Sequence, residues 1–65
     1  MGKFNVGDKV TFVLKKEGIK TGVIRNRRSA LTLSGDNVVL YDIFVEKDNV
    51  LHKGIREALI DEFKN

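Results

Sequence analysis

The segment Asn37-Val-Val-Leu-Tyr-Asp-Ile-Phe-Val-Glu46 is the longest apolar run of the chain. Its β-branched and aromatic residues suit a pleated, packed surface, and turn-forming clusters stand on both sides, at Ser34–Asn37 and Lys47–Asn49. The run therefore predicts a central β-strand. Because successive side chains of a strand point to opposite faces, one face carries Val39, Tyr41, Ile43 and Val45, and the other carries Val38, Leu40, Asp42 and Phe44.

Two further strands are expected before this one. From Lys9 to Lys15 apolar residues recur at every second position, at Val10, Phe12 and Leu14, and so share one face. This period of two is typical of a half-buried strand. Gly18 then suits the positive backbone angle of a short hairpin loop. A second strand follows from Ile19 to about Arg27, with Ile24 as its expected core residue and Gly22 as the expected site of a bulge or a close backbone approach.

The secondary structure of the segments before and after the central strand is less clear from the sequence. Residues 27–37 fit either a loop with some extended character or an extension of the flanking hairpin. After the central strand we expect a short strand from Val50 to Lys53, ended by Gly54. The tail, residues 55–65, has the spacing of an amphipathic helix, but a single helix would point Ile60 away from the apolar stripe. We therefore expect a 3-10 turn over residues 55–58 and a closing strand over residues 59–63.

Length and charge limit what the chain can be. Its 65 residues make one domain, residues 1–65, which buries only about 60% of its extended-chain surface. No segment approaches the roughly 18 apolar residues of a membrane span, and the polar N-terminus lacks the pattern of a secretory signal, so we expect a cytoplasmic protein without a membrane partner. Twelve basic and nine acidic residues give a net charge of +3, which favours weak attraction to polyanions.

Four segments together resemble the successive strands of Src-homology-3-like (SH3-like) barrels. They are Val6-Gly7-Asp8-Lys9-Val10, Lys20-Thr21-Gly22-Val23-Ile24, Val39-Leu40-Tyr41-Asp42-Ile43 and Gly54-Ile55-Arg56-Glu57-Ala58-Leu59. In that group a Gly-Asp turn leads into the first strand, and a 3-10 turn precedes the last. The resemblance implies a mainly all-β fold, a small SH3-like barrel of four to five short antiparallel strands with a short helical turn near the C-terminus. Similar short barrels occur in phage and mobile-element proteins and in nucleic-acid-associated modules, so we expect a bacterial or phage origin.

Catalytic chemistry is poorly supported by the sequence. The chain has one histidine and no cysteine, so a Cys-His pair and a multi-histidine metal site are excluded. We interpret His52 as a surface residue, and the six glycines form no phosphate-binding loop motif. The plasmid-borne type II dihydrofolate reductases have a similar layout, but their Val-Gln-Ile-Tyr segment has no counterpart here. We therefore expect no enzyme, no catalytic or metal-ligating residue and no cofactor.

One binding hypothesis rests on basic residues. Arginines are densest between positions 25 and 28, and lysines lie across the preceding hairpin, where basic side chains could contact phosphates. The alternative is an ordinary solvated face. The residues predicted to bind a nucleic acid weakly through its phosphates are Lys15, Lys16, Lys20, Arg25, Arg27 and Arg28.

A second hypothesis rests on the central strand. Asp42 is expected either to face solvent or to pair across strands with a Lys or Arg, because Asp is seldom buried unpaired; the alternative is a site for a cationic group. Its face also carries Val38, Leu40 and Phe44, an apolar stripe that would suit a protein partner or a homodimer. Alternatively, residues 30–33 or the C-terminal tail cover this stripe.

Overall fold

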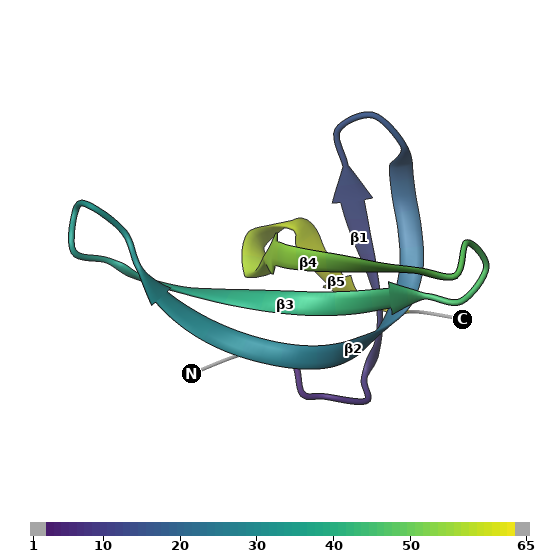
Figure 1. The fold of residues 1–65 in the computed structure, drawn as a ribbon, viewed down its shortest axis with the longest axis horizontal. Coiled ribbons are helices and arrows are strands. Elements are labelled where there is room, and N and C mark those ends of the chain that lie inside the picture. Colours follow the sequence, from purple (N-terminus) through teal and green to yellow (C-terminus); the bar gives the residue numbers. More distant parts are fainter. Residues whose placement is uncertain (1–2, 64–65) are drawn as a thin grey trace.

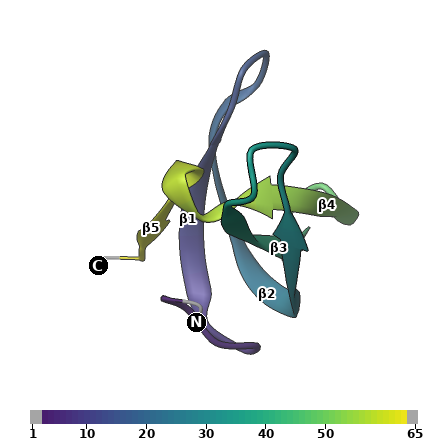
Figure 2. The same ribbon diagram turned by 90° about the vertical axis from the view of Figure 1, so that its left-hand side faces the viewer.

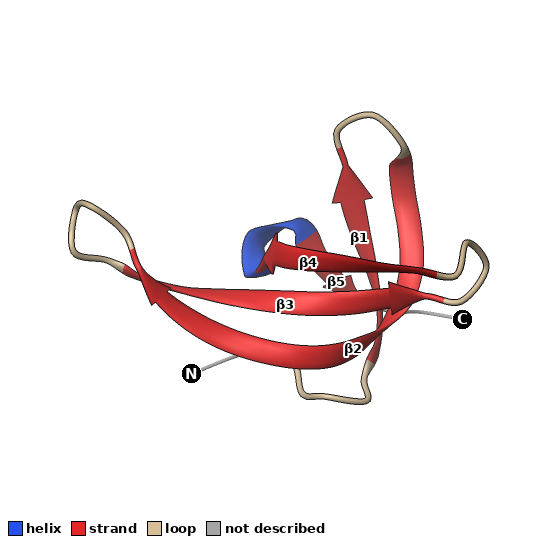
Figure 3. Cartoon of the chain, viewed as in Figure 1, coloured by secondary structure: helices blue, strands red, loops and turns tan. Residues whose placement is uncertain are grey.

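The computed structural model describes residues 3–63, which form five antiparallel strands and one 3-10 turn (Figures 1 and 3). The sheet order is β4-β3-β2-β1-β5. This confirms the expected all-β fold class, with its helical turn near the C-terminus. The elements are β1 (Lys9–Leu14), β2 (Gly18–Leu31), β3 (Asn37–Val45), β4 (Val50–Arg56), the 3-10 turn η1 (Glu57–Leu59) and β5 (Ile60–Glu62).

Strand β2 joins the two halves of the sheet. Its first part pairs with β1, and its second part pairs with β3 from Val23 to Leu31. Between them β2 bends sharply, so that β1 stands across the direction of β3 and β4 (Figures 1 and 2). Gly22 lies at the bend, where a Cβ atom would stand 2.6 Å from the Phe44 carbonyl oxygen, and a β-bulge follows between Ile24 and Asn26. Both expectations for this strand are confirmed, the close approach and the core position of Ile24.

The bend closes the sheet over a small apolar core. Val10 and Phe12 from β1, and Tyr41, Ile43 and Val45 from β3, are buried as the alternation predicts, and Leu14 and Val39 pack against them. The sequence did not single out Phe4, which is 5% exposed. The full core is Phe4, Val10, Phe12, Ile24, Tyr41, Ile43, Val45, Ile55 and Ile60.

The segment before β1 is bound to the core by backbone hydrogen bonds. The Gly7 N–H donates to the Ile24 carbonyl at 2.8 Å, and the Ile24 N–H donates to the Asp8 carbonyl at 3.0 Å. These bonds give the edge of β2 a partner where β1 no longer pairs with it. They also bring Phe4 over Tyr41, with ring centroids 5.8 Å apart in an edge-to-face arrangement.

The C-terminal third differs from the prediction in one respect. Gly54 does not end the fourth strand, because β4 continues to Arg56 through a bulge opposite Asp42. Gly54 has φ +70° there, a conformation that glycine adopts without steric cost, so the strand passes through it. The preferred interpretation of the tail is confirmed: a 3-10 turn precedes a short closing strand, the turn beginning two residues and the strand one residue later than expected.

The ambiguous residues 27–37 extend the β2–β3 hairpin. β2 reaches Leu31, and β3 begins at Asn37 in register with it. The tip between them is internally bonded: the Thr32 N–H donates to the Asp36 carbonyl at 2.9 Å, and the Gly35 N–H donates to the Thr32 carbonyl at 3.0 Å. The hairpin extends well beyond the core (Figure 1).

Candidate functional site

The side of β2, β3 and β4 that faces away from the core carries most of the candidate residues, and we call it the outer face. The core side of β3 is set by Tyr41 and Ile43, so Asp42 and its alternating neighbours lie on the outer face. Strand register then assigns the flanking residues: Arg28 and Arg56 both stand opposite Leu40, and Leu51 stands opposite Phe44. By alternation Lys53 follows the inward-facing His52 and also belongs to the outer face.

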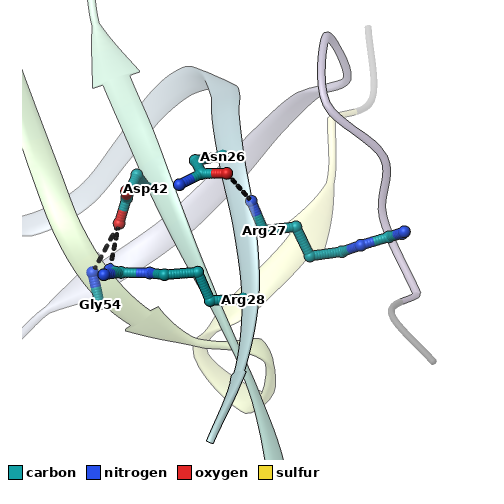
Figure 4. Close-up of polar contacts among 5 residues, drawn as sticks. All are labelled: Asn26, Arg27, Arg28, Asp42 and Gly54. Carbon is teal, nitrogen blue, oxygen red and sulfur yellow. Dashed lines mark hydrogen bonds and ion pairs between the residues drawn. The ribbon is translucent and has the colours of Figure 1, made fainter.

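Asp42 lies at the centre of this face and is held by both neighbouring strands (Figure 4). Its Oδ1 accepts a hydrogen bond from Arg28 Nη2 at 2.7 Å and another from the Gly54 N–H at 3.1 Å. Asp42 is only 7% exposed, so the solvent-facing interpretation is wrong and the cross-strand pairing is confirmed. A β-bulge in each neighbouring strand lies beside it, between Ile24 and Asn26 in β2 and around Gly54 in β4.

Arginine side chains cover much of the apolar stripe. The guanidinium of Arg25 lies 4.9 Å from the centroid of the Phe44 ring, a cation–π contact. Leu40 has an arginine as its cross-strand neighbour on either side. Val38, Leu40 and Phe44 are half-buried, and Val38 has Ala30, from residues 30–33, as its neighbour on β2. Long basic side chains commonly shield apolar surface in this way while their charged ends stay in water.

The six basic residues predicted as a group do not lie together. Arg27 points to the other side of the sheet (Figure 4), where its Nη1 donates to the Phe4 carbonyl at 2.9 Å and to Asn5 Oδ1 at 3.1 Å. Lys15 and Lys16 lie in the turn between β1 and β2. Of the predicted group, only Arg25 and Arg28 lie on the outer face.

Lys20 is committed to an ion pair away from that face. Its Nζ lies 2.8 Å from Asp48 Oδ2 and 3.6 Å from Glu17 Oε1. The hydrogen bond with Asp48 raises the pKa of Lys20, and the same bond lowers the pKa of Asp48. The ion pair joins the first hairpin to the turn between β3 and β4. The two neighbouring carboxylates offset the charge of Lys20, so it is a poorer candidate for binding a phosphate than the residues of the outer face.

Two basic residues of the outer face, Lys53 and Arg56, were missed by reasoning from the sequence. They lie in a strand that was expected to end at Gly54, and nothing in the local composition marks them. Lys53 was the last residue of the expected strand, and its face follows only from the inward orientation of His52 opposite Ile43, which the sequence did not predict. The exposed basic residues of the face are thus Arg25, Lys53 and Arg56, with Arg28 paired to Asp42.

The described residues offer little for catalysis. Among residues 3–63, no group of three or more His, Cys, Asp or Glu side chains could hold a metal ion. His52 is half-buried rather than a surface residue, with its ring 5.4 Å from that of Phe12, and its Nε2 has no hydrogen-bond partner within the described part of the chain. Nor do residues 3–63 include a helix long and apolar enough to cross a membrane.

Comparison with known proteins adds no relative. No protein-family model matches the chain, and neither a curated protein nor a solved structure is significantly similar to it. The grouping with SH3-like barrels therefore remains a prediction from the sequence. The properties of the outer face are the basis on which a function can be proposed.

Proposed function

We propose that this chain is a non-enzymatic binding module of the cytoplasm that contacts the phosphate backbone of a nucleic acid with its outer face. The observation that carries the proposal is the convergence of four basic residues from β2 and β4 around a single buried carboxylate. Strand alternation and register bring Arg25, Arg28, Lys53 and Arg56 to this face, where Asp42 is the one opposing charge among the outward-facing residues of β2, β3 and β4.

The charge balance of this face favours a polyanion. Arg28 and Asp42 compensate one another, which leaves three exposed cations, and the net charge of the whole chain is also +3. Each phosphate neutralised by a basic residue releases condensed counterions from the nucleic acid, and this release is a major source of affinity. The Asp42 contact holds the Arg28 guanidinium and offsets its charge, so the three exposed cations carry the phosphate contacts.

Phe44 gives the face an aromatic element that single strands can use. It is half-buried beneath Arg25, and both a guanidinium plane and an aromatic ring can stack on an unpaired base. The sequence, read as a linear pattern, places no aromatic residue within the basic cluster. The fold brings one there from the neighbouring strand.

The alternative function, a protein interface formed by Val38, Leu40 and Phe44, is less favoured. All three residues are half-buried, and Phe44 lies beneath a charged side chain that a partner would have to displace or pair. Burying an unpaired guanidinium costs free energy that a small apolar contact does not offset. A phosphate backbone could instead pair with the Arg25 guanidinium in the position it already holds over Phe44.

A pair of charge-matched variants tests the proposal. The face variant carries Arg25→Gln, Lys53→Gln and Arg56→Gln, and the turn variant carries Lys15→Gln, Lys16→Gln and Lys47→Gln. Both remove three positive charges, but the second removes them from turns outside the outer face. Affinity for fluorescent duplex and single-stranded oligonucleotides is measured at low salt by anisotropy.

We expect the face variant to lose at least about tenfold in affinity, since each phosphate contact contributes separately, and the turn variant to lose far less. Equal losses in both variants would mean that net charge alone attracts the oligonucleotide. Lack of binding by the unmodified chain at low salt would refute the proposal outright.

A further inference from the structure

The β2–β3 hairpin has an unpaired backbone edge. β3 pairs with β2 along its whole length, but its pairing with β4 begins only at Leu40, opposite Arg56. Residues 37–39 of β3 therefore have a strand on one side only within the described chain. Free strand edges are usually protected by a lysine, a proline or a bulge, and Asn37-Val38-Val39 contains none of these.

An open groove runs along this edge. It has a volume of about 640 Å³ and is lined by residues 37–39, by residues 56–58 and by Ser29. The groove continues the line of β4, because the chain turns away into η1 immediately after Arg56. An extended segment lying in the groove would take the place of β4 beside the end of β3.

Two strongly exposed apolar side chains lie at the same end of the hairpin. Leu31 is 73% exposed and Leu33 is 110% exposed. The tip that carries Leu33 is held by side-chain bonds as well as backbone ones: Thr32 Oγ1 and Ser34 Oγ are 2.9 Å apart, and the Asp36 N–H donates to Thr32 Oγ1 at 3.1 Å. A leucine presented on an ordered tip loses little conformational freedom when it is covered.

We propose that a second copy of this chain occupies the groove, so that two hairpins pair through residues 37–39 of β3 about a two-fold axis at Val38. The paired edges form a continuous antiparallel sheet in the order β2-β3-β3-β2 across the two copies. Self-pairing of this kind is isologous, since the same patch serves both subunits.

Charge complementarity selects this occupant. When Val38 stands opposite the partner's Val38, the antiparallel register brings the partner's Asp36 toward Leu40. Within one copy, Arg56 is the residue of β4 that stands opposite Leu40. Asp36 of each copy therefore meets Arg56 of the other at the end of β4. The symmetry makes two such pairs, one on each side of the axis, beside the hairpin tip that carries Leu33 and Asp36.

The inference does not depend on the phosphate-binding proposal, but it adds to it. A two-fold axis between antiparallel strands is perpendicular to the sheet, so the outer faces of both copies lie on the same side. With Arg56 paired to Asp36, the dimer would present Arg25 and Lys53 of both copies to one nucleic acid, and the second contact would then be intramolecular.

Cysteine cross-linking tests the geometry, because the chain contains no cysteine of its own. Directly opposed residues of an antiparallel pair have Cβ atoms about 4.5–5.5 Å apart, close to the reach of a disulfide. Val38→Cys is expected to form a disulfide-linked dimer within minutes in a glutathione redox buffer. The control is Val13→Cys, a valine in β1 that is 45% exposed, and it is expected to stay monomeric. Equal cross-linking of the two variants, or none at Val38, would overturn the proposal.

Sedimentation velocity without nucleic acid tests the charge pairs. The unmodified chain is expected to shift from monomer to dimer between about 10 μM and 1 mM, as a small interface requires. Asp36→Lys and Arg56→Glu are each expected to weaken the dimer by at least about tenfold, and the double variant to restore it to within about threefold. A monomer throughout the concentration range, or no rescue in the double variant, would contradict the pairing, whatever the result of the oligonucleotide titrations.

Discussion

The hydroxyl group of Tyr41 joins the two ends of the described chain. It accepts a hydrogen bond from the Phe4 N–H at 3.1 Å and donates one to Glu57 Oε2 at 2.7 Å. The same carboxylate accepts the Lys3 N–H at 2.8 Å. Burial raises the pKa of Tyr41, so the neutral donor persists at physiological pH. One buried polar atom thus positions both the segment before β1 and the turn before β5.

Removing this hydroxyl should destabilise the fold. Tyr41→Phe keeps the ring in the core but leaves the buried Phe4 N–H without its acceptor, which costs about 1–3 kcal/mol. Urea denaturation followed by circular dichroism measures the loss. Thr21→Ala, a change at an exposed strand residue, serves as the control and should shift the midpoint little. An unchanged midpoint in Tyr41→Phe would show that the hydroxyl does not stabilise the chain ends.

Glu57 gives this connection a pH dependence. The hydrogen bond from the Lys3 N–H, followed by that from Tyr41, holds the pKa of Glu57 below its ordinary value of 4.5. Because the folded-state pKa is the lower one, ionised Glu57 contributes stability above pH 4.5, and this contribution is lost as the pH falls through the folded-state pKa. Glu57→Gln has no such dependence. The Tm of the wild-type chain should exceed that of Glu57→Gln from about pH 5 to 7, and the difference should shrink toward about pH 3. A constant difference would argue against the linkage.

At the scale of elements, the bend of β2 decides where everything else lies. Gly22 permits it, since a Cβ atom there would approach Ile43 Cγ2 to 2.7 Å as well as the Phe44 carbonyl oxygen. The bulge after Ile24 then turns Arg25 onto the outer face, above Phe44. β-Bulges commonly redirect a side chain in this way.

Gly22→Ala should therefore be strongly destabilising. The added methyl group meets backbone and a buried side chain on β3, neither of which can move freely, so we expect a loss of about 1–3 kcal/mol or more. Thermal unfolding measures it, with Ser29→Ala in the outer part of the same strand as a control. Wild-type stability in Gly22→Ala would mean that β2 and β3 separate more easily at this point than their register implies.

The sequence predicted the strands in which apolar and polar residues alternate. It failed where a bulge adds a residue to one strand and so changes the alternation of side chains between the two faces. The periods in β1 and β3 identified most of the core, because one face of each strand is buried. Gly54 appeared to end a strand, whereas a bulge lets β4 pass through it, and Arg56 was missed for that reason. Phe4 was missed because its burial depends on its own hydrogen bond to Tyr41 and on the bonds of Gly7 and Asp8 with Ile24, which are distant in sequence.

At the scale of the whole molecule, two separate hypotheses from the sequence concern one surface. The basic cluster and the apolar stripe came from different segments, yet pairing of β2 with β3 places Arg28 beside Leu40 and brings Arg25 over Phe44. Arg27 does not belong to the cluster, because its side chain points to the opposite face of β2 from that of Arg28 and contacts the Phe4 carbonyl. Linear spacing cannot give this result, since it requires the register of three strands and the positions of two bulges.

The salt dependence of oligonucleotide binding tests the central claim most directly. Three exposed cations on the outer face, each neutralising one phosphate, predict a slope of log K against log salt of about −2.7 on duplex DNA. Affinity should then fall roughly fortyfold between 50 and 200 mM salt. The variant lacking Arg25, Lys53 and Arg56 should have a slope near zero, and the turn variant should keep the wild-type slope. A wild-type slope near zero, or the same slope in the wild-type chain and the face variant, would contradict phosphate binding by the outer face.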